Sequence, residues 1–306
     1  MTGFLLRRTL LAVPLLLGVA TIVFSLIHLI PGDPVEVMLG AGAGAADISG
    51  LRHRLGLDRP LLLQYADFMV RLLRGDLGIS LRYQDPVGAL LAERYPATLL
   101  LASCSMILAL LLAIPAGVSA ALRPGGLADR LTSVASALAL SLPSFWLGPL
   151  LILVFAIRLD LLPVSGMDSP AAVLLPAFTL ALSLAALLTR LLRASLLEES
   201  GANYLRAARS RGLSRVGAAV RHALRNALAP VLTVAALQLG SLLTGAILTE
   251  TIFAWPGLGR LLIQAIAHRD YPLVQGCVLL IAATYVAVNL AADLLHVLLD
   301  PRAAAR

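Results

Sequence analysis

The stretch ATLLLASCSMILALLLAIPAGVSAAL, residues 97–122, contains 26 residues and no charged side chain. As an α-helix it would be roughly 39 Å long at about 1.5 Å per residue, which exceeds the ~30 Å hydrocarbon core of a bilayer. A helix that is apolar on every side must be buried in protein or lie in a membrane. The stretch therefore predicts a membrane-spanning helix.

The composition of the whole chain agrees with this prediction. Of the 306 residues, 59% are apolar and 13% are charged, and the mean hydropathy is +0.90. A water-soluble fold of this size could not remove so much apolar surface from water. The sequence predicts an all-α polytopic membrane protein with six transmembrane helices, at about 9–30, 97–122, 131–157, 173–193, 227–250 and 275–299.

The first apolar stretch follows Arg7 and Arg8, as it would in a signal peptide. It continues to Ile30 without a convincing cleavage site, so we interpret it as an uncleaved span. Pro14, Pro115, Pro143, Pro149 and Pro176 fall inside spans. Membrane helices tolerate such prolines as kinks.

Arginines in short loops set the predicted orientation. All 24 basic residues are arginine, and eight of them lie between residues 190 and 225. The short loops on the opposite side hold three, at Arg158, Arg260 and Arg269, and the long segment 31–96 is left out because segments of that length cross largely regardless of charge. We therefore expect both termini and the 194–226 loop to be cytoplasmic.

The segment 31–96 is expected on the external side. Asp58 is placed to cap a helix that Gly75 would end, and Asp67 and Arg71 are spaced for an i,i+4 ion pair. The sequence predicts a short amphipathic helix packed against the outer end of the bundle.

The segment RAARSRGLSRVGAAVRHALRNALAP, residues 206–230, has six arginines and no acid. It predicts two short helices: one over about 200–211 that Gly212 ends, and one that Ser214 caps and that runs toward Pro230, where the fifth span would begin. Attraction to anionic lipid headgroups explains the charge. It does not explain the small pair Ala207–Ala208 or the sharp turn, which suit a helix that seats in a groove on a partner protein.

The absence of lysine excludes several chemistries. A Walker A loop needs its lysine on the phosphates, and a Schiff base needs a lysine amine. If ATP drives this protein, another chain binds it. Cys104 and Cys277 lie in apolar runs and are expected to be small buried residues rather than a disulfide or metal pair.

Polar residues inside spans often line a path or hold helices together. Gln238, Ser241 and Gly245 share one face of the fifth span, which is consistent with a translocation path and equally with close helix packing.

Two other sets of polar residues have the spacing of a functional site. Asn289, Asp293 and His296 are spaced as a relay or metal site, but a hydrogen-bonded cluster near the cytoplasmic end is the favoured interpretation. His28 with Asp33 is a weak metal motif, and we predict no metal site in this chain.

The segment YLRAARSRGLSRVGAAVRHALRNALAP, residues 204–230, resembles the cytoplasmic EAA loop of permease subunits in bacterial ATP-binding-cassette (ABC) importers. Ala207, Ala208, Gly212 and Pro230 match the pattern, and Arg206 replaces its glutamate. The whole chain is similar to B-type permeases of the dipeptide, oligopeptide and nickel branch. The matching motifs are PGDP (31–34), LGLDRPLLLQY (55–65), GDLGIS (75–80), SLPSFWLG (141–148), ETIFAWPGLGRLL (250–262), RDYPLVQG (269–276) and NLAADLLHVLLDPR (289–302).

This resemblance implies a type I importer fold with an external insertion after the first span. Residues 1–96 would form the first helix and the external segment, and 97–300 the transmembrane domain with the coupling loop at about 194–226. The loop would insert into a cytoplasmic ATPase subunit, with contacts from Tyr204, Arg206, Ala207, Ala208 and Gly212.

The resemblance also implies partners: a second homologous permease, two ATPase subunits that bind ATP and Mg²⁺, an extracytoplasmic solute-binding protein, and membrane lipid, with no nucleic acid. The chain would be a non-enzymatic permease of the bacterial cytoplasmic membrane that binds no cofactor itself. Its cargo would be di- or oligopeptides, with nickel or metal chelates as the alternative and glutathione-like compounds sharing the architecture. An ion-coupled secondary transporter and an intramembrane hydrolase are less favoured, because the spans lack mid-membrane acids and a nucleophile with a matched base.

Overall fold

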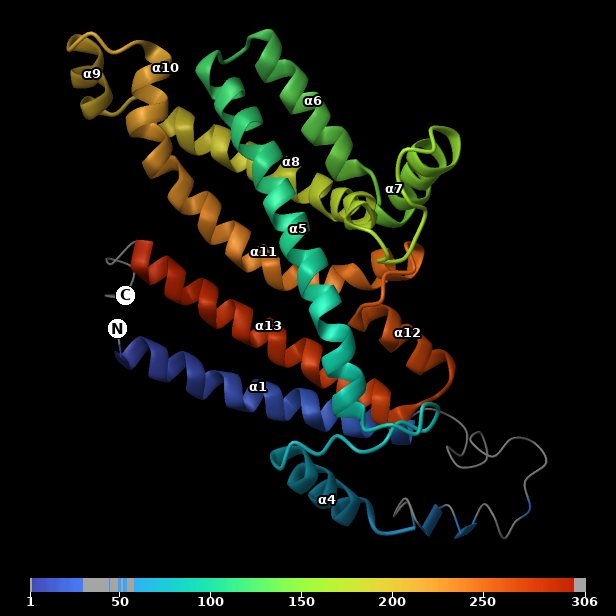
Figure 1. Ribbon diagram of the computed structural model, residues 1–306. Helices are drawn as coiled ribbons and strands as arrows, with labels where there is room; N and C mark the ends of the chain where they lie inside the picture. Colours follow the sequence, from blue (N-terminus) through green and yellow to red (C-terminus); the bar gives the residue numbers. More distant parts are fainter. Residues whose placement is uncertain (1, 30–43, 45–48, 51, 54–57, 300–306) are drawn as a thin grey trace. The chain divides into compact units, whose positions relative to one another are not determined.

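The computed structural model describes residues 2–29, 44, 49–50, 52–53 and 58–299. These residues are almost entirely helical (Figure 1), and they contain no strand beyond an isolated bridge between Ile79 and Pro86. Within them the chain forms two compact units. One comprises residues 97–256 and 287–299, and the other comprises residues 2–96 and 257–286.

The helices follow one another along the chain with short connections. They are α1 (Thr2–Leu29), α4 (Leu61–Leu73), α5 (Val87–Leu122), α6 (Leu127–Ser141), α7 (Ser144–Leu151), the π-helix η1 (Ile152–Arg158), the 3₁₀ turn η2 (Pro170–Val173), α8 (Leu174–Glu199), α9 (Asn203–Ser210), α10 (Arg215–Ala218), the π-helix η3 (Ala219–Ala223), α11 (Leu224–Ile252), α12 (Leu258–Ala267) and α13 (Tyr271–Leu299).

The predicted fold class is confirmed, because the described residues include several helices long and apolar enough to cross a bilayer. Four single helices meet this condition: Val87–Leu122, Pro170–Glu199, Val216–Leu243 and Tyr271–Leu294. The apolar part of α1, Leu10–Ser25, is shorter. The described chain thus has four such helices, or five if α6 and α7–η1 count as one bent span, and the predicted number of six is not confirmed.

The continuous third helix expected over 131–157 is broken in the structure. The helix axes of α6 and α7–η1 meet at 103°. Leu142 between them is extended, with φ −85° and ψ 118°, and it precedes Pro143. A residue before proline is pushed out of the helical region by the proline ring, so this proline makes a break rather than a kink.

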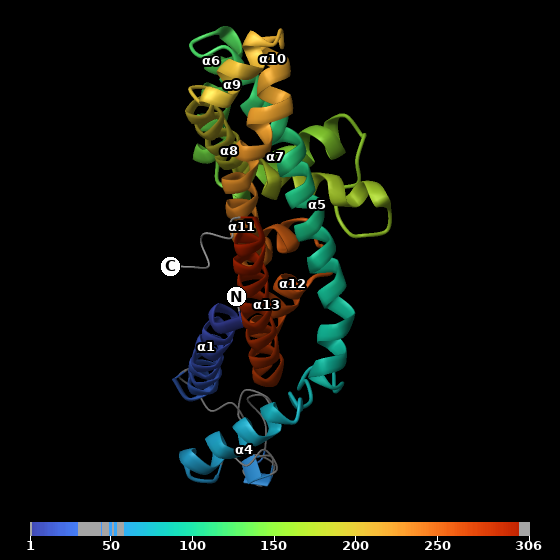
Figure 2. The same ribbon diagram turned by 90° about the vertical axis from the view of Figure 1, so that its left-hand side faces the viewer.

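Helix α8 is the centre of the unit formed by residues 97–256 and 287–299. It contacts α6, α7 and α11, which can be followed in Figures 1 and 2. Its Leu188 and Leu192 are fully buried. Gly117 of α5 lies so close to Leu192 that an added Cβ would be 3.0 Å from its side chain, so α5 and α8 approach where α5 has no side chain.

The second unit joins α1, α4, α12 and the adjoining ends of α5 and α13. Val87 and Gly276 approach closely, because a Cβ on the glycine would lie 2.4 Å from the valine side chain. The buried Asp270 accepts hydrogen bonds from the Ser80 hydroxyl and from the backbone N–H of Arg82 and Leu273. One carboxylate thereby ties the turn after α4 to the start of α13.

The short helix predicted within the segment 31–96 is present as α4, with different end contacts. Asp58 does not cap it, because its carboxylate lies 2.6 Å from the His53 ring. Gly75 ends it as predicted, at φ +75°. Its N–H donates to Leu72 and the next N–H, of Asp76, donates to Arg71, which is the Schellman arrangement.

The ion pair predicted within α4 is also different. Asp67 pairs with Arg59 at 3.0 Å rather than with Arg71. Arg59 precedes the helix, so the chain folds back over the first turns and brings an arginine to this carboxylate. Sequence spacing alone does not reveal such a competitor.

Candidate functional site: the helical loop after α8

The loop after α8 forms the predicted helix–turn–helix. Helix α9 ends at a turn in which Gly212 has φ +93°, a conformation that costs little only for glycine. The Gly212 N–H donates to Arg209 and the Leu213 N–H to Ala208, at 3.0 and 3.3 Å. Both backbone bonds satisfy carbonyl groups at the helix end.

Ser214 caps the second helix as expected, because its hydroxyl accepts the Gly217 N–H at 3.0 Å. This helix does not stop near Pro230. It runs through α10 and η3 directly into α11, and Pro230 lies inside the continuous helix. The loop is therefore connected to the next span without a flexible joint.

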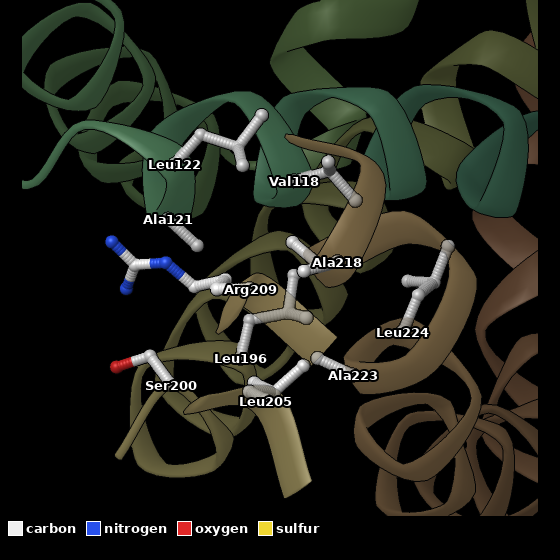
Figure 3. A pocket seen from close by; sticks show the side chains of 11 residues that line it. Val118, Ala121, Leu122, Leu196, Ser200, Leu205, Arg209, Ala218, Ala223 and Leu224 are labelled. Atoms are coloured by element: carbon white, nitrogen blue, oxygen red, sulfur yellow. The ribbon is translucent and has the colours of Figure 1, made fainter. Parts of the chain in front are cut away.

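One side chain anchors α9 to the rest of its unit. Leu205 is 5% exposed and is the only buried residue of α9. It lines a pocket of about 250 Å³ enclosed by the ends of α5 and α8 and by the start of the second loop helix. Figure 3 shows Leu205 among the side chains around this pocket, with Arg209 and Ser200 carrying the polar groups. Because this pocket is not filled by side chains, the inner side of α9 is not tightly packed.

Tyr204 provides the polar attachment of α9. Its hydroxyl donates to the Glu199 carboxylate and accepts the Asn226 amide N–H at 3.1 Å. Burial of the phenol, together with the contact to Glu199, raises the pKa of Tyr204 above its usual value. The hydroxyl thus links the end of α8, α9 and the beginning of α11.

The five predicted docking residues lie on one short segment but differ in exposure. Arg206, Ala207 and Gly212 are exposed. Tyr204 is 40% exposed, and Ala208 is half-buried against the hydrophobic core cluster. The two alanines therefore have different roles: one leaves the outer surface flat, and the other packs inward.

The outer surface of the loop is strongly positive. Arg206, Arg209 and Arg211 are exposed, and none of them forms an ion pair within the part of the chain that the structure describes. Uncompensated surface arginines attract anionic headgroups or acidic side chains. The electrostatics agree with either a lipid or a protein neighbour, whereas the flat Ala207 surface suits a protein.

The predicted path residues stay a prediction. Gln238 is half-buried and Ser241 is exposed on α11. Gly245 lies outside the residues whose surroundings the structure describes, as do His296, His28 and Asp33.

Sequence reasoning missed an ion pair beside the loop. Arg193 of α8 donates from Nε and a terminal nitrogen to both carboxylate oxygens of Asp129, at 2.5 and 2.8 Å. The Gly125 N–H adds a third bond to this carboxylate, at 2.8 Å. An acid in the first turn of an apolar helix and an arginine near the end of a span were the available signals, because each needs a partner at membrane depth.

A second missed cluster lies at the other end of α11. Glu250 is fully buried and accepts the Thr98 hydroxyl at 2.7 Å. The Trp255 indole N–H donates to the Ala97 carbonyl at 2.9 Å. These contacts join α5 to the end of α11 and explain why a carboxylate is tolerated there. Cys277 is buried and Cys104 half-buried, both as free thiols, in agreement with the prediction.

Comparisons with known proteins agree with the architecture. Residues 1–102 match the N-terminal model, and residues 113–305 the main model, of the binding-protein-dependent transport system inner membrane component. Among solved structures, the chain resembles the MetNI methionine ABC transporter (TM-score 0.55, 20% identity, 69% of this chain and 96% of the other). It also resembles an amino acid ABC transporter (0.52, 19%, 70% and 94%). This likeness confirms the transporter permease fold.

Curated relatives match over nearly the whole chain. The dipeptide transport system permease DppB of Escherichia coli K12 is 42% identical over an alignment of 339 positions, covering 99% of this chain and 98% of the relative. The di/tripeptide permease DppB of Pseudomonas aeruginosa is 41% identical at the same coverage, and the glutathione permease GsiC of Salmonella typhimurium is 39% identical with 98% of each chain covered. The chain therefore belongs to the family of binding-protein-dependent transport inner membrane components and is a multi-pass permease subunit of an ABC importer rather than an enzyme.

Proposed function

We propose that this permease forms the path for di- or oligopeptides through an ATP-driven importer and that α9 is its coupling helix. The observation that carries the coupling role is the loop geometry. A short helix presents the exposed Arg206 and Ala207 outward and is tied by Tyr204 to α8 and α11. A partner that moves α9 therefore pulls on two membrane helices.

The motor is a separate chain. The sequence has no lysine and thus no P-loop, so ATP and Mg²⁺ belong to two cytoplasmic ATPase subunits. A second homologous permease completes the pore, and an extracytoplasmic solute-binding protein delivers the cargo. We place both termini and the α8–α11 loop in the cytoplasm, since the arginines concentrate there.

The peptide cargo is supported by the names of the relatives. Two are di- or tripeptide permeases and one is a glutathione permease, and glutathione is itself a tripeptide. None of these three is named for nickel, which therefore remains the second candidate. In reconstituted importer, dipeptide should compete with labelled peptide uptake, and a nickel chelate should not.

Crosslinking in cells tests the coupling role. A photoreactive residue at Arg206 should capture the ATPase subunit, because this side chain is exposed on α9. The control is the same residue at Leu127, which is 75% exposed at the start of α6. Arg123 and Arg130 flank it, so the same charge rule places it in the cytoplasm. Equal capture at both positions, or no capture at Arg206 in transport-competent cells, would refute the proposal.

Cysteine labelling tests the orientation. A cysteine at Ser210 in α9 should react with an impermeant maleimide only after lysis, whereas one at Arg74 after α4 should react in intact cells. Both positions are exposed, so access is set by the side of the membrane. The opposite pattern would reverse the topology.

A further inference from the structure

Helix α4 has an apolar face that nothing in the described chain covers. Leu62 and Leu73 are 83% and 86% exposed, and Leu63 and Val70 are 54% and 46% exposed. At 100° per residue these four side chains, with Ala66 among them, form one continuous stripe along the helix. Solvent exposure of so many large apolar residues on one short helix calls for a partner.

A second face of α4 packs on α1. The Tyr65 hydroxyl lies 2.8 Å from that of Thr21. The Phe24 ring lies 5.3 Å from the ring of Tyr65 and 5.6 Å from that of Phe68, centroid to centroid. These contacts hold α4 against the C-terminal part of α1 (Figure 1).

The third face is polar. Gln64, Asp67, Arg71 and Arg74 follow one another on the side of the helix between the other two faces. Around the helix, the face packed on α1 is therefore followed by the exposed apolar face and then by the polar face. This is the pattern of a helix that lies in a membrane–water interface, with cationic groups on its polar side.

Helix α4 cannot cross the membrane itself, because its 13 residues extend only about 20 Å. Its neighbour α1 is an apolar helix whose Leu17 and Ile22 are 50% and 62% exposed, next to the residues that contact α4. Helix α4 is thus held beside a helix that exposes apolar side chains of its own.

We propose that α4 is an amphipathic anchor lying in the interface of the bilayer, with Leu62 and Leu73 inserted among the acyl chains. Arg71 and Arg74 lie at the level of the lipid phosphates. Lipid is favoured over a protein occupant because Arg71 and Arg74 lie on the polar side that borders the stripe, as in interfacial helices, and because α4 packs on an apolar helix. Placing α4 in the outer leaflet rests on the proposed orientation. Its position in a membrane–water interface does not.

Site-directed spin labelling tests this anchor. Single cysteines at Leu62, Leu73, Asp67 and Arg74 are labelled after replacement of the two native cysteines by alanine. The importer complex is reconstituted in vesicles of phosphatidylethanolamine and phosphatidylglycerol. Collision rates are then measured with molecular oxygen, which concentrates in lipid, and with a water-soluble nickel chelate.

The labels at Leu62 and Leu73 should collide mainly with oxygen, and those at Asp67 and Arg74 mainly with the nickel chelate. The last two positions are controls, since Asp67 and the C-cap residue Arg74 are exposed on the polar side of the same helix. Predominant nickel-chelate collisions at all four positions would overturn the proposal. So would labels at Leu62 and Leu73 shielded from both reagents, which would mean a protein covers the stripe. Neither result depends on the ATPase, so the anchor and the coupling role fail independently.

Discussion

Replacing Leu205 by alanine should detach the coupling helix without dismantling the bundle. Leu205 is the one buried residue of α9 and is 5% exposed. Buried leucine-to-alanine changes cost about 2–5 kcal/mol. The pocket of about 250 Å³ beside this side chain already lacks part of the packing, so the lower end of that range applies. We expect about 2–3 kcal/mol.

A loss of this size lowers the equilibrium constant for docking of α9 by about 30- to 150-fold, because about 1.4 kcal/mol is a factor of ten. The assays are hydrogen exchange of the α9 amides and ATPase activity stimulated by the solute-binding protein. Exchange in α9 should accelerate while that in α8 stays slow, and stimulated activity should fall. Membrane insertion should be normal, since the packing within α8 is untouched.

Two controls sharpen the experiment. Leu205→Met conserves volume and should cost less than about 1.5 kcal/mol. Val216→Ala alters a residue of the same loop that is 54% exposed, and it should change little. Unchanged exchange and unchanged stimulation in Leu205→Ala would refute the view that one side chain seats the coupling helix.

Two further predictions concern residues around the loop. Gly212→Ala should reduce coupled transport several-fold, and Gly212→Asn should reduce it less. A Cβ at this position meets no atom within 4 Å, so the only cost is the backbone strain of φ +93°, about 1–2 kcal/mol. Equal activity of wild type and both variants in an uptake assay would contradict this prediction. Asp129→Asn should lower the thermal midpoint of the purified complex by weakening the pair with Arg193, at a cost of about 1–3 kcal/mol because the arginine side chain is 32% exposed. The double variant Asp129→Asn/Arg193→Gln should recover part of the loss, and a double variant no better than the single one would argue against the pair.

Local signals in the sequence predicted local structure well. Gly75 and Gly212 end helices at positive φ, and Ser214 caps the second loop helix. Each of these depends on one residue and its immediate backbone, so neighbours far along the chain do not alter it.

Predicted side-chain contacts failed where a second partner was available to the same carboxylate. Asp58 binds His53 instead of capping α4, and Asp67 binds Arg59 instead of Arg71. In both cases the spacing allowed the predicted contact, but chain folding outside the helix supplied another partner. Likewise, Pro143 was compatible with either a kink or a break in the third predicted span. The structure shows a break, after which α7 packs against α8 and α11.

By itself the sequence determined the fold class and the need for an external motor. Long charge-free runs must become helices in a bilayer, because no water is present there to bond the backbone, and a chain without lysine has no P-loop. Tertiary structure alone decided that α9 rests on Leu205 beside a pocket, that Asp129 pairs with Arg193, and that α4 has an apolar stripe that the described part of the chain does not cover. These features join residues distant in the chain, and their energies depend on distance and burial, which a linear pattern does not contain.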